Sequence, residues 1–150
     1  MSGIDRRRNR NHYKKVENQG AIEAGDFREY MNELLDEYGA QIITAVESTA
    51  KKVSNEARLD LRNVPKSVVG GYGFYSSGWR SSFKADKLRV TATVYNANEW
   101  QLTHLLEYGH QVRRGGRKVG EAEAHPHINE VKDWAFKEFD RRLREEISKL

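Results

Sequence analysis

The chain of 150 residues contains no cysteine, and proline and methionine occur only twice each. The absence of cysteine excludes disulfides, thiolate zinc sites and cysteine nucleophiles together. No apolar run approaches the roughly 20 residues that a membrane-spanning helix needs. No apolar stretch follows the basic residues near the N-terminus, so we also expect no secretory signal. A reducing compartment such as a cytoplasm suits a cysteine-free chain.

Hydrophobic residues are also scarce, at 37% of the chain against 32% charged residues. The aromatic residues (three Trp, seven Tyr and five Phe) are nevertheless enough to seed a core. A chain of this length suits one domain and can fold without metals or disulfides. We expect most charges on solvated helix faces, where pairs such as Glu138–Arg142 and Glu145–Lys149 stand one turn apart.

The net charge of +4 is concentrated at the N-terminus. Residues 1–20 hold six basic and two acidic residues, which leaves 20 of each in the other 130 residues. We therefore predict a basic arm over residues 1–20, followed by a single domain over residues 21–150. A segment of this composition should be disordered when free, and such arms either stay solvated or dock on nucleic acid or protein. Its candidate interface residues are Arg6, Arg7, Arg8 and Arg10.

Two stretches have the periodicity of long amphipathic helices. The first begins near Asp26, a predicted N-cap, and must end by Pro65, while Gly39 is where we expect any bend. The second runs from a predicted cap at Asn129 to about Ser148. Their apolar stripes, which we expect to face the core, are Phe27, Met31, Leu34, Leu35, Tyr38, Ile42, Val46, Ala50, Val53 and Ala57 in the first and Val131, Trp134, Ala135, Phe139, Leu143 and Ile147 in the second.

Between these helices the pattern predicts a small sheet and a short helix. Residues 67–83, rich in glycine, serine and aromatics, indicate a flexible hairpin or loop without the Walker lysine of a phosphate loop. Residues 88–95 alternate as a half-buried strand does. Residues 99–108 predict a short helix that Gly109 ends, and residues 113–118 form a basic glycine loop. The strand's apolar side is Leu88, Val90, Ala92 and Val94.

The expected fold class is α+β: a long N-terminal helix, a small antiparallel sheet, a short helix and a C-terminal helix packed on the sheet.

Four histidines and one glutamate gather in the second half of the chain: His104, Glu107, His110, His125 and His127. These are residue types that bind metal, but the spacing His-x-x-Glu-x-x-His is not that of a zincin helix. A structural role is favoured, with His110 bonding free carbonyls at the helix end. No Gly-x-Ser-x-Gly elbow is present. We therefore predict no metal, no cofactor and no catalysis.

Three short motifs follow one another in this region. They are Leu102–His110 (Leu-Thr-His-Leu-Leu-Glu-Tyr-Gly-His), Gly115-Gly116-Arg117 and Ala124–Ile128 (Ala-His-Pro-His-Ile). With Gly78-Trp79 ahead of them, they resemble the tail-completion, or head–tail joining, family of long-tailed bacteriophages and prophages, which includes the gene-ten-type tail components of lambdoid phages. The resemblance covers about residues 25–148. Asn129-Glu130 stands where the family often has Pro-Ala.

The resemblance implies a structural protein of the phage neck or tail that performs no catalysis. It implies several copies in a ring, a hexamer or dodecamer, assembled in the host cytoplasm and located in the virion. The implied partners are other neck, connector and tail proteins, and DNA passing through the ring lumen, with no membrane. Candidate interface residues outside the arm are Glu107, His110, Arg113, Arg114 and Arg117. We expect Glu107 either to cap backbone amides or to pair with an arginine of the same or the next subunit.

Nucleic-acid binding is the main alternative. The arm and residues 113–118 are basic, and Tyr72, Phe74, Tyr75 and Trp79 are side chains that stack on bases. No recognised nucleic-acid-binding motif is present, however, and a charge-balanced body is a poor footprint for a sequence reader. A metal-dependent hydrolase that uses the histidines is the third hypothesis.

Overall fold

The computed structural model describes residues 24–65, 67–69, 73–86 and 89–150. The basic arm predicted over residues 1–20, with Arg6, Arg7, Arg8 and Arg10, lies outside the described residues. By its contacts the chain divides into two units, Met1–Gln41 and Ile42–Leu150.

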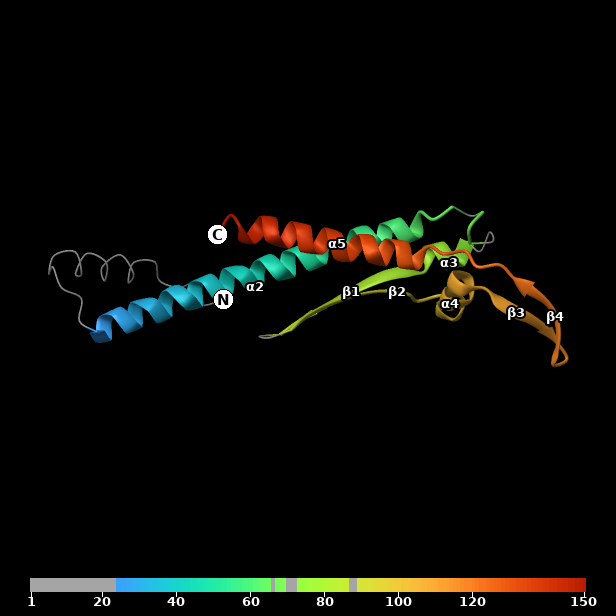
Figure 1. The fold of residues 1–150 in the computed structure, drawn as a ribbon, viewed down its shortest axis with the longest axis horizontal. Coiled ribbons are helices and arrows are strands. Elements are labelled where there is room, and N and C mark those ends of the chain that lie inside the picture. The colour runs from blue at the N-terminus through green and yellow to red at the C-terminus, as the bar shows by residue number, and fades with distance from the viewer. Residues whose placement is uncertain (1–23, 66, 70–72, 87–88) are drawn as a thin grey trace. The chain divides into compact units, whose positions relative to one another are not determined.

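The element order confirms the α+β class (Figure 1). Instead of one sheet there are two, each a pair of antiparallel strands, β1 with β2 and β3 with β4. Along the described chain the elements are α2 (Ala24–Arg62), α3 (Gly73–Ser77), β1 (Trp79–Ala85), β2 (Val90–Asn96), α4 (Trp100–Tyr108), β3 (His110–Arg114), β4 (Arg117–Ala122) and α5 (Ile128–Ile147). Within the described ranges, none of the helices combines the length and hydropathy that a membrane crossing requires.

Helix α2 confirms the predicted long helix and continues through Gly39. The N-cap prediction was wrong, because Ala24 is already helical and Asp26 therefore lies inside the helix. The apolar stripe divides into two parts. In the second unit the stripe residues Ala50, Val53 and Ala57 are buried, as are Ala45 and Leu61 outside the stripe. In the first unit four large side chains of the stripe stay exposed: Phe27, Leu34, Leu35 and Tyr38. The prediction of a continuous core-facing stripe was wrong there, because nothing among the described residues covers it.

A small core of four buried residues holds the second unit together: Leu61, Val69, Tyr75 and Trp79. The rings of Tyr75 and Trp79 meet edge to face, with centroids 5.7 Å apart, a geometry worth about 0.5–1.5 kcal/mol beyond the burial itself. Partly buried apolar side chains from the segment after α2 and from β2, α4 and α5 pack around this core: Val64, Val68, Val94, Leu102, Leu106, Ile128 and Val131.

The segment before the predicted strand is more regular than we expected. Gly73–Ser77 forms α3, and Trp79–Ala85 forms β1, which pairs with β2 from Trp79↔Asn96 to Ala85↔Val90. In β1, Trp79 is buried and Phe83 half-buried, and Lys51 of α2 places its Nζ 4.5 Å from the centre of the Phe83 ring. The strand was missed because its other residues are short, polar or charged, so its pattern is weak.

The predicted strand is confirmed as β2, with Val90 and Val94 half-buried. The prediction that Ala92 is buried was wrong, because this two-stranded ribbon leaves that position exposed. Leu88 lies outside the described residues.

The predicted basic glycine loop is instead a β-hairpin, since β3 and β4 pair as antiparallel strands. Only Gly115 and Gly116 form the turn, and their φ angles are +56° and +78°. Positive φ at both central residues is the requirement of a type I′ turn, whose twist matches that of the flanking strands. Arg113 and Arg114 therefore lie on β3, and Arg117 on β4.

Helix α5 confirms the predicted C-terminal helix. Its N-cap is His127, so the prediction of Asn129 was wrong by two residues. It runs alongside the part of α2 that belongs to the second unit, in the opposite direction (Figure 1). The guanidinium of Arg142 joins the two helices through two hydrogen bonds of 2.7 Å to the carboxylate of Glu56. No residue of α5 is fully buried, so its predicted stripe is only half-covered.

Candidate functional site

The carboxylate of Glu107, in the last turn of α4, lies at the N-terminus of α5. It accepts backbone hydrogen bonds from His127 and Ile128 at 2.8 Å and from Asn129 at 2.9 Å. The side chain of Glu107 is only 3% exposed. The first turn of a helix has four N–H groups without intrahelical partners, and an anion there is also favoured by the helix dipole. Of the two roles we expected for Glu107, the structure contains the capping of backbone amides.

The same contacts determine the ionisation of Glu107. Burial acts to raise its pKa, but the three backbone N–H groups and the nearby His127 outweigh burial, so the pKa is lowered. A carboxylate that accepts several backbone N–H bonds favours its charged form. Glu107 is therefore an anion at neutral pH and a fixed negative charge inside the fold.

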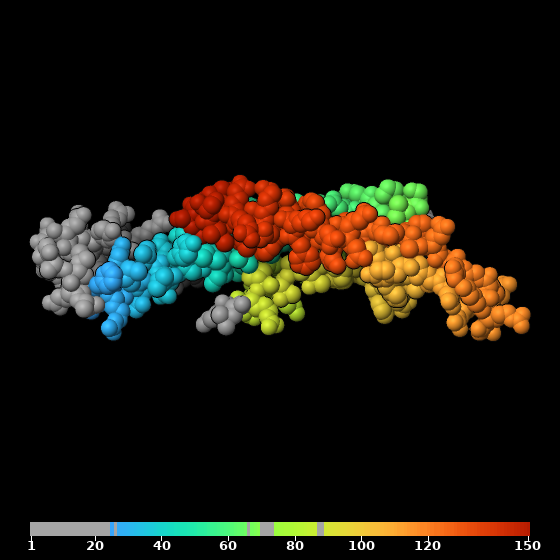
Figure 2. Space-filling model, viewed as in Figure 1, coloured from blue at the N-terminus to red at the C-terminus, as the bar shows by residue number. Residues whose placement is uncertain are grey.

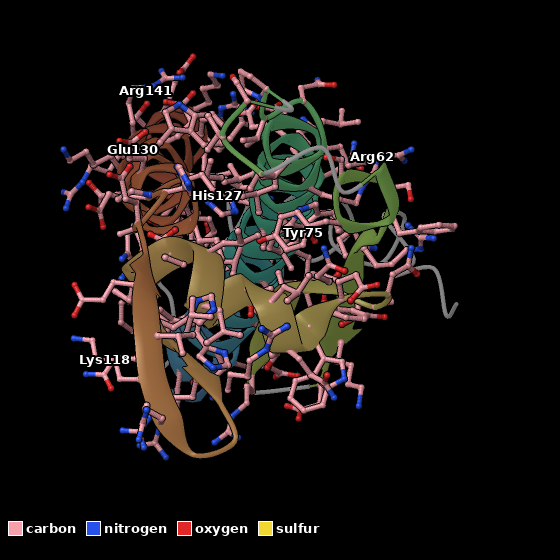
Figure 3. The ribbon with its side chains drawn as sticks, turned by 90° about the vertical axis from the view of Figure 1, so that its right-hand side faces the viewer. Arg62, Tyr75, Lys118, His127, Glu130 and Arg141 are labelled. Atoms are coloured by element: carbon pink, nitrogen blue, oxygen red, sulfur yellow. The ribbon has the colours of Figure 1, made fainter. Side chains whose placement is uncertain are left out.

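His127 and Tyr75 extend this cluster into the core. His127 Nδ1 lies 2.6 Å from the carbonyl oxygen of His125, and since a carbonyl can only accept, Nδ1 donates. In the neutral ring Nε2 then accepts from the hydroxyl of Tyr75, at 2.8 Å. Figure 3 shows Tyr75 and His127 in the interior, while Lys118 and Arg141 point outward. We call Tyr75, Glu107 and His127 the Glu107 joint.

The Glu107 joint is poorly suited to catalysis. Tyr75 has no exposed surface, and burial, with the charge of Glu107, raises the pKa of its hydroxyl far above the usual value. A hydroxyl that keeps its proton is a poor base and a poor nucleophile. The arrangement fastens α4, α5 and the aromatic core to one another.

Gly109 allows the motifs Leu102–His110 and Ala124–Ile128 to lie against each other. Its φ is +70°, and a Cβ there would come within 2.6 Å of the carbonyl oxygen of Ala122. Only glycine tolerates both conditions. Nearby, the N–H of His125 donates to the carbonyl of Leu106 at 2.6 Å. The segments 105–110 and 124–128 are therefore two sides of one contact, with the Glu107 carboxylate between them.

Gly78 is held in the same network through Asn96, the last residue of β2. Asn96 is buried, and its Nδ2 donates to the carbonyl of Tyr75 at 2.7 Å. Its Oδ1 accepts from the N–H groups of Asn98 and Glu99, at 3.1 and 2.9 Å, where α4 begins. A Cβ at Gly78 would lie 2.3 Å from this Oδ1. The Gly78-Trp79 element is thereby tied to the helix that carries Glu107.

The other candidate residues lie apart from the joint. His110, Arg113, Arg114 and Arg117 are all exposed on the β3–β4 hairpin. Among the described residues, no group of three or more histidine, aspartate or glutamate side chains is placed to hold a metal ion.

Of the four aromatic residues proposed to stack on bases, Tyr75 and Trp79 belong to the core and are inaccessible, so that expectation was wrong for them. Phe74 is 76% exposed, and Tyr72 lies outside the described residues.

Comparison with protein-family models, with curated proteins and with solved structures finds no match for this chain.

Proposed function

We propose that the chain is a structural protein of the neck or tail of a long-tailed bacteriophage, which forms a ring that completes the tail and helps join it to the head. One observation carries the proposal. Two of the motifs that carry the resemblance, Leu102–His110 and Ala124–Ile128, meet in the Glu107 joint. Motifs that occur together in a family are expected to lie together in the fold when they form one contact. The two motifs lie together in this structure.

The surface also supports an assembly role over catalysis. Among the described residues, fourteen large apolar side chains are each at least 40% exposed, while only eight apolar residues are buried. Scattered apolar side chains are normal on a surface, whereas contiguous apolar patches mark interaction sites. Phe27, Leu34, Leu35 and Tyr38 lie along one face of α2 and are exposed. We place the protein in the virion, after assembly in the host cytoplasm as a hexamer or dodecamer beside other neck, connector and tail proteins.

Deleting the gene from its parental phage or prophage tests this role. We expect lysates to contain filled heads and separate tails in electron micrographs, and expression of the intact chain in trans to restore joined particles. Antibody labelling of wild-type virions should mark the neck. Normal particles from the deletion strain would contradict the proposed function.

Nucleic-acid binding is the second candidate, because no ion pair within the described ranges reaches the exposed Arg113, Arg114 or Arg117. It predicts binding to mixed-sequence DNA with a steep salt dependence. The logarithm of the affinity should fall linearly with the logarithm of the salt concentration. A smaller slope after substitution of these three arginines would favour nucleic-acid binding.

A metal-dependent hydrolase stays the third hypothesis. Elemental analysis of the purified protein tests it, and stoichiometric zinc together with loss of stability on chelation would support it.

A further inference from the structure

The part of the first unit that the structure describes has an acidic surface without ion-pair partners among the described residues. In residues 27–41, which we call the acidic half-helix, four acidic residues and one basic residue, Arg28, give a net charge of −3. Glu29, Glu33 and Glu37 follow one another at i,i+4 spacing, and like charges at this spacing repel each other along a helix. All three are exposed, and no ion pair among the described residues involves them. This row is unfavourable in an isolated helix. The acidic members are Glu29, Glu33, Asp36 and Glu37.

An uncovered apolar stripe borders this row. Phe27, Leu34, Leu35 and Tyr38 are between 44% and 61% exposed, and Leu34 is one turn from Glu37. The described side chains from residue 25 to residue 44 include none that is buried. In proteins, most of the stability of a helix comes from packing its apolar face against other residues. The stripe therefore needs cover, and the acidic row indicates that the cover is cationic.

The β3–β4 hairpin has the opposite character. In residues 110–122 four basic residues and one acidic residue, Glu121, give a net charge of +3. The register places Arg113 opposite Lys118 and Arg114 opposite Arg117, and like charges directly opposite each other destabilise a strand pair. Lys118 is partly compensated by an ion pair with Glu121.

The hairpin also lacks cover. Every residue of β3 is exposed, and Val112 and Val119 keep 40% and 57% of their surface. A lone two-stranded hairpin is marginally stable at best in water. Figure 2 shows it at the right, in orange, where it extends beyond the rest of the second unit.

We infer that the β3–β4 hairpin of one copy docks on the acidic half-helix of a second copy. Each surface has uncovered apolar side chains and a row of repelling charges, and the two net charges are equal and opposite, so docking relieves both repulsions at once. Because each chain has both surfaces, the contact is heterologous and repeats from copy to copy, as a ring requires. The apolar contacts supply affinity, and the charges set register and rate of association. The inference rests on the proposed ring and names its interface.

Charge reversal in the full-length protein tests this pairing. One variant carries Arg113→Glu, Arg114→Glu and Arg117→Glu, and the other carries Glu29→Lys, Glu33→Lys and Glu37→Lys. Sedimentation velocity at about 50 mM salt, where charges are weakly screened, should show association of the wild type and at least about tenfold weaker association of either variant alone. An equal mixture of the two variants should associate again, because each hairpin then meets a helix of opposite charge.

A third variant is the matched control. Lys132→Glu, Lys137→Glu and Arg144→Glu reverse three charges on α5, outside both surfaces, and should leave association unchanged. Circular dichroism establishes that each variant is folded before it is compared.

Three results would overturn the inference: a monomeric wild type, unchanged association of either reversed variant, or a mixture that does not recover. Loss of DNA binding by the hairpin variant, without loss of self-association, would assign the hairpin to nucleic acid instead. None of these results decides whether the protein joins tails to heads, because the gene deletion measures that separately.

Discussion

Replacing Glu107 by glutamine removes the charge at the start of α5 while nearly preserving the shape of the side chain. The wild-type carboxylate accepts three backbone N–H bonds through its two oxygens. A glutamine has one acceptor oxygen, and its amide group is a donor that faces donors. At least one buried N–H group therefore loses its partner.

The expected loss follows from these contacts. An unsatisfied buried N–H costs about 1–3 kcal/mol, and bonds to a charged acceptor exceed neutral ones by about 1 kcal/mol each. Together these give about 3 kcal/mol for Glu107→Gln, a large part of the 5–15 kcal/mol that is typical of a domain. Glu130 lies in the same first turn, but its side chain is exposed and accepts no backbone hydrogen bond from the described residues. Glu130→Gln loses only the helix-dipole contribution, about 0.3–1 kcal/mol.

Urea unfolding monitored by circular dichroism at pH 7 measures both losses. The pH dependence provides a second test, since the pKa of Glu107 is lowered in the folded protein. Its stabilisation is complete above the unfolded pKa of about 4.3 and is lost as pH falls through the lower folded value. The difference between wild type and Glu107→Gln should therefore be constant near neutral pH and shrink below about pH 4. Equal losses for Glu107→Gln and Glu130→Gln would refute the capping role.

Three further predictions concern the rest of the chain. Gly78→Ala places a methyl group against the buried side chain of Asn96 and should lower the free energy of unfolding by about 1–3 kcal/mol. Gly120→Ala, with open space around it, should lower it clearly less, and thermal unfolding of both variants measures the difference. Arg142→Ala breaks the ion pair between α2 and α5 and should lower the thermal unfolding midpoint more than Arg144→Ala, whose pair with a residue of its own helix is exposed. High salt should reduce both losses. Deleting residues 1–20 should leave the unfolding curve unchanged and weaken assembly, and an unfolded truncated protein would show that the arm belongs to the domain.

The sequence alone determined the features that depend on near neighbours. The periodicity of α2, α4 and α5, and Gly109 at the end of α4, were all predicted and found. The ion pairs Glu138–Arg142 and Glu145–Lys149 were predicted and are present too. Each depends on residues within about one helical turn, so a local pattern contains the information.

The tertiary structure decided what depends on distant residues. Strand β1 exists because β2 pairs with it, and the basic segment after Gly109 becomes a hairpin because Gly115 and Gly116 both adopt positive φ. No local pattern distinguishes a covered apolar stripe from an uncovered one, so the exposed half of α2 was assigned to the core. The joint is likewise a product of the fold, since Tyr75 and His127 are 52 positions apart in the chain. Burial and hydrogen bonding are set by which surfaces meet, and a single sequence does not state which surfaces those are.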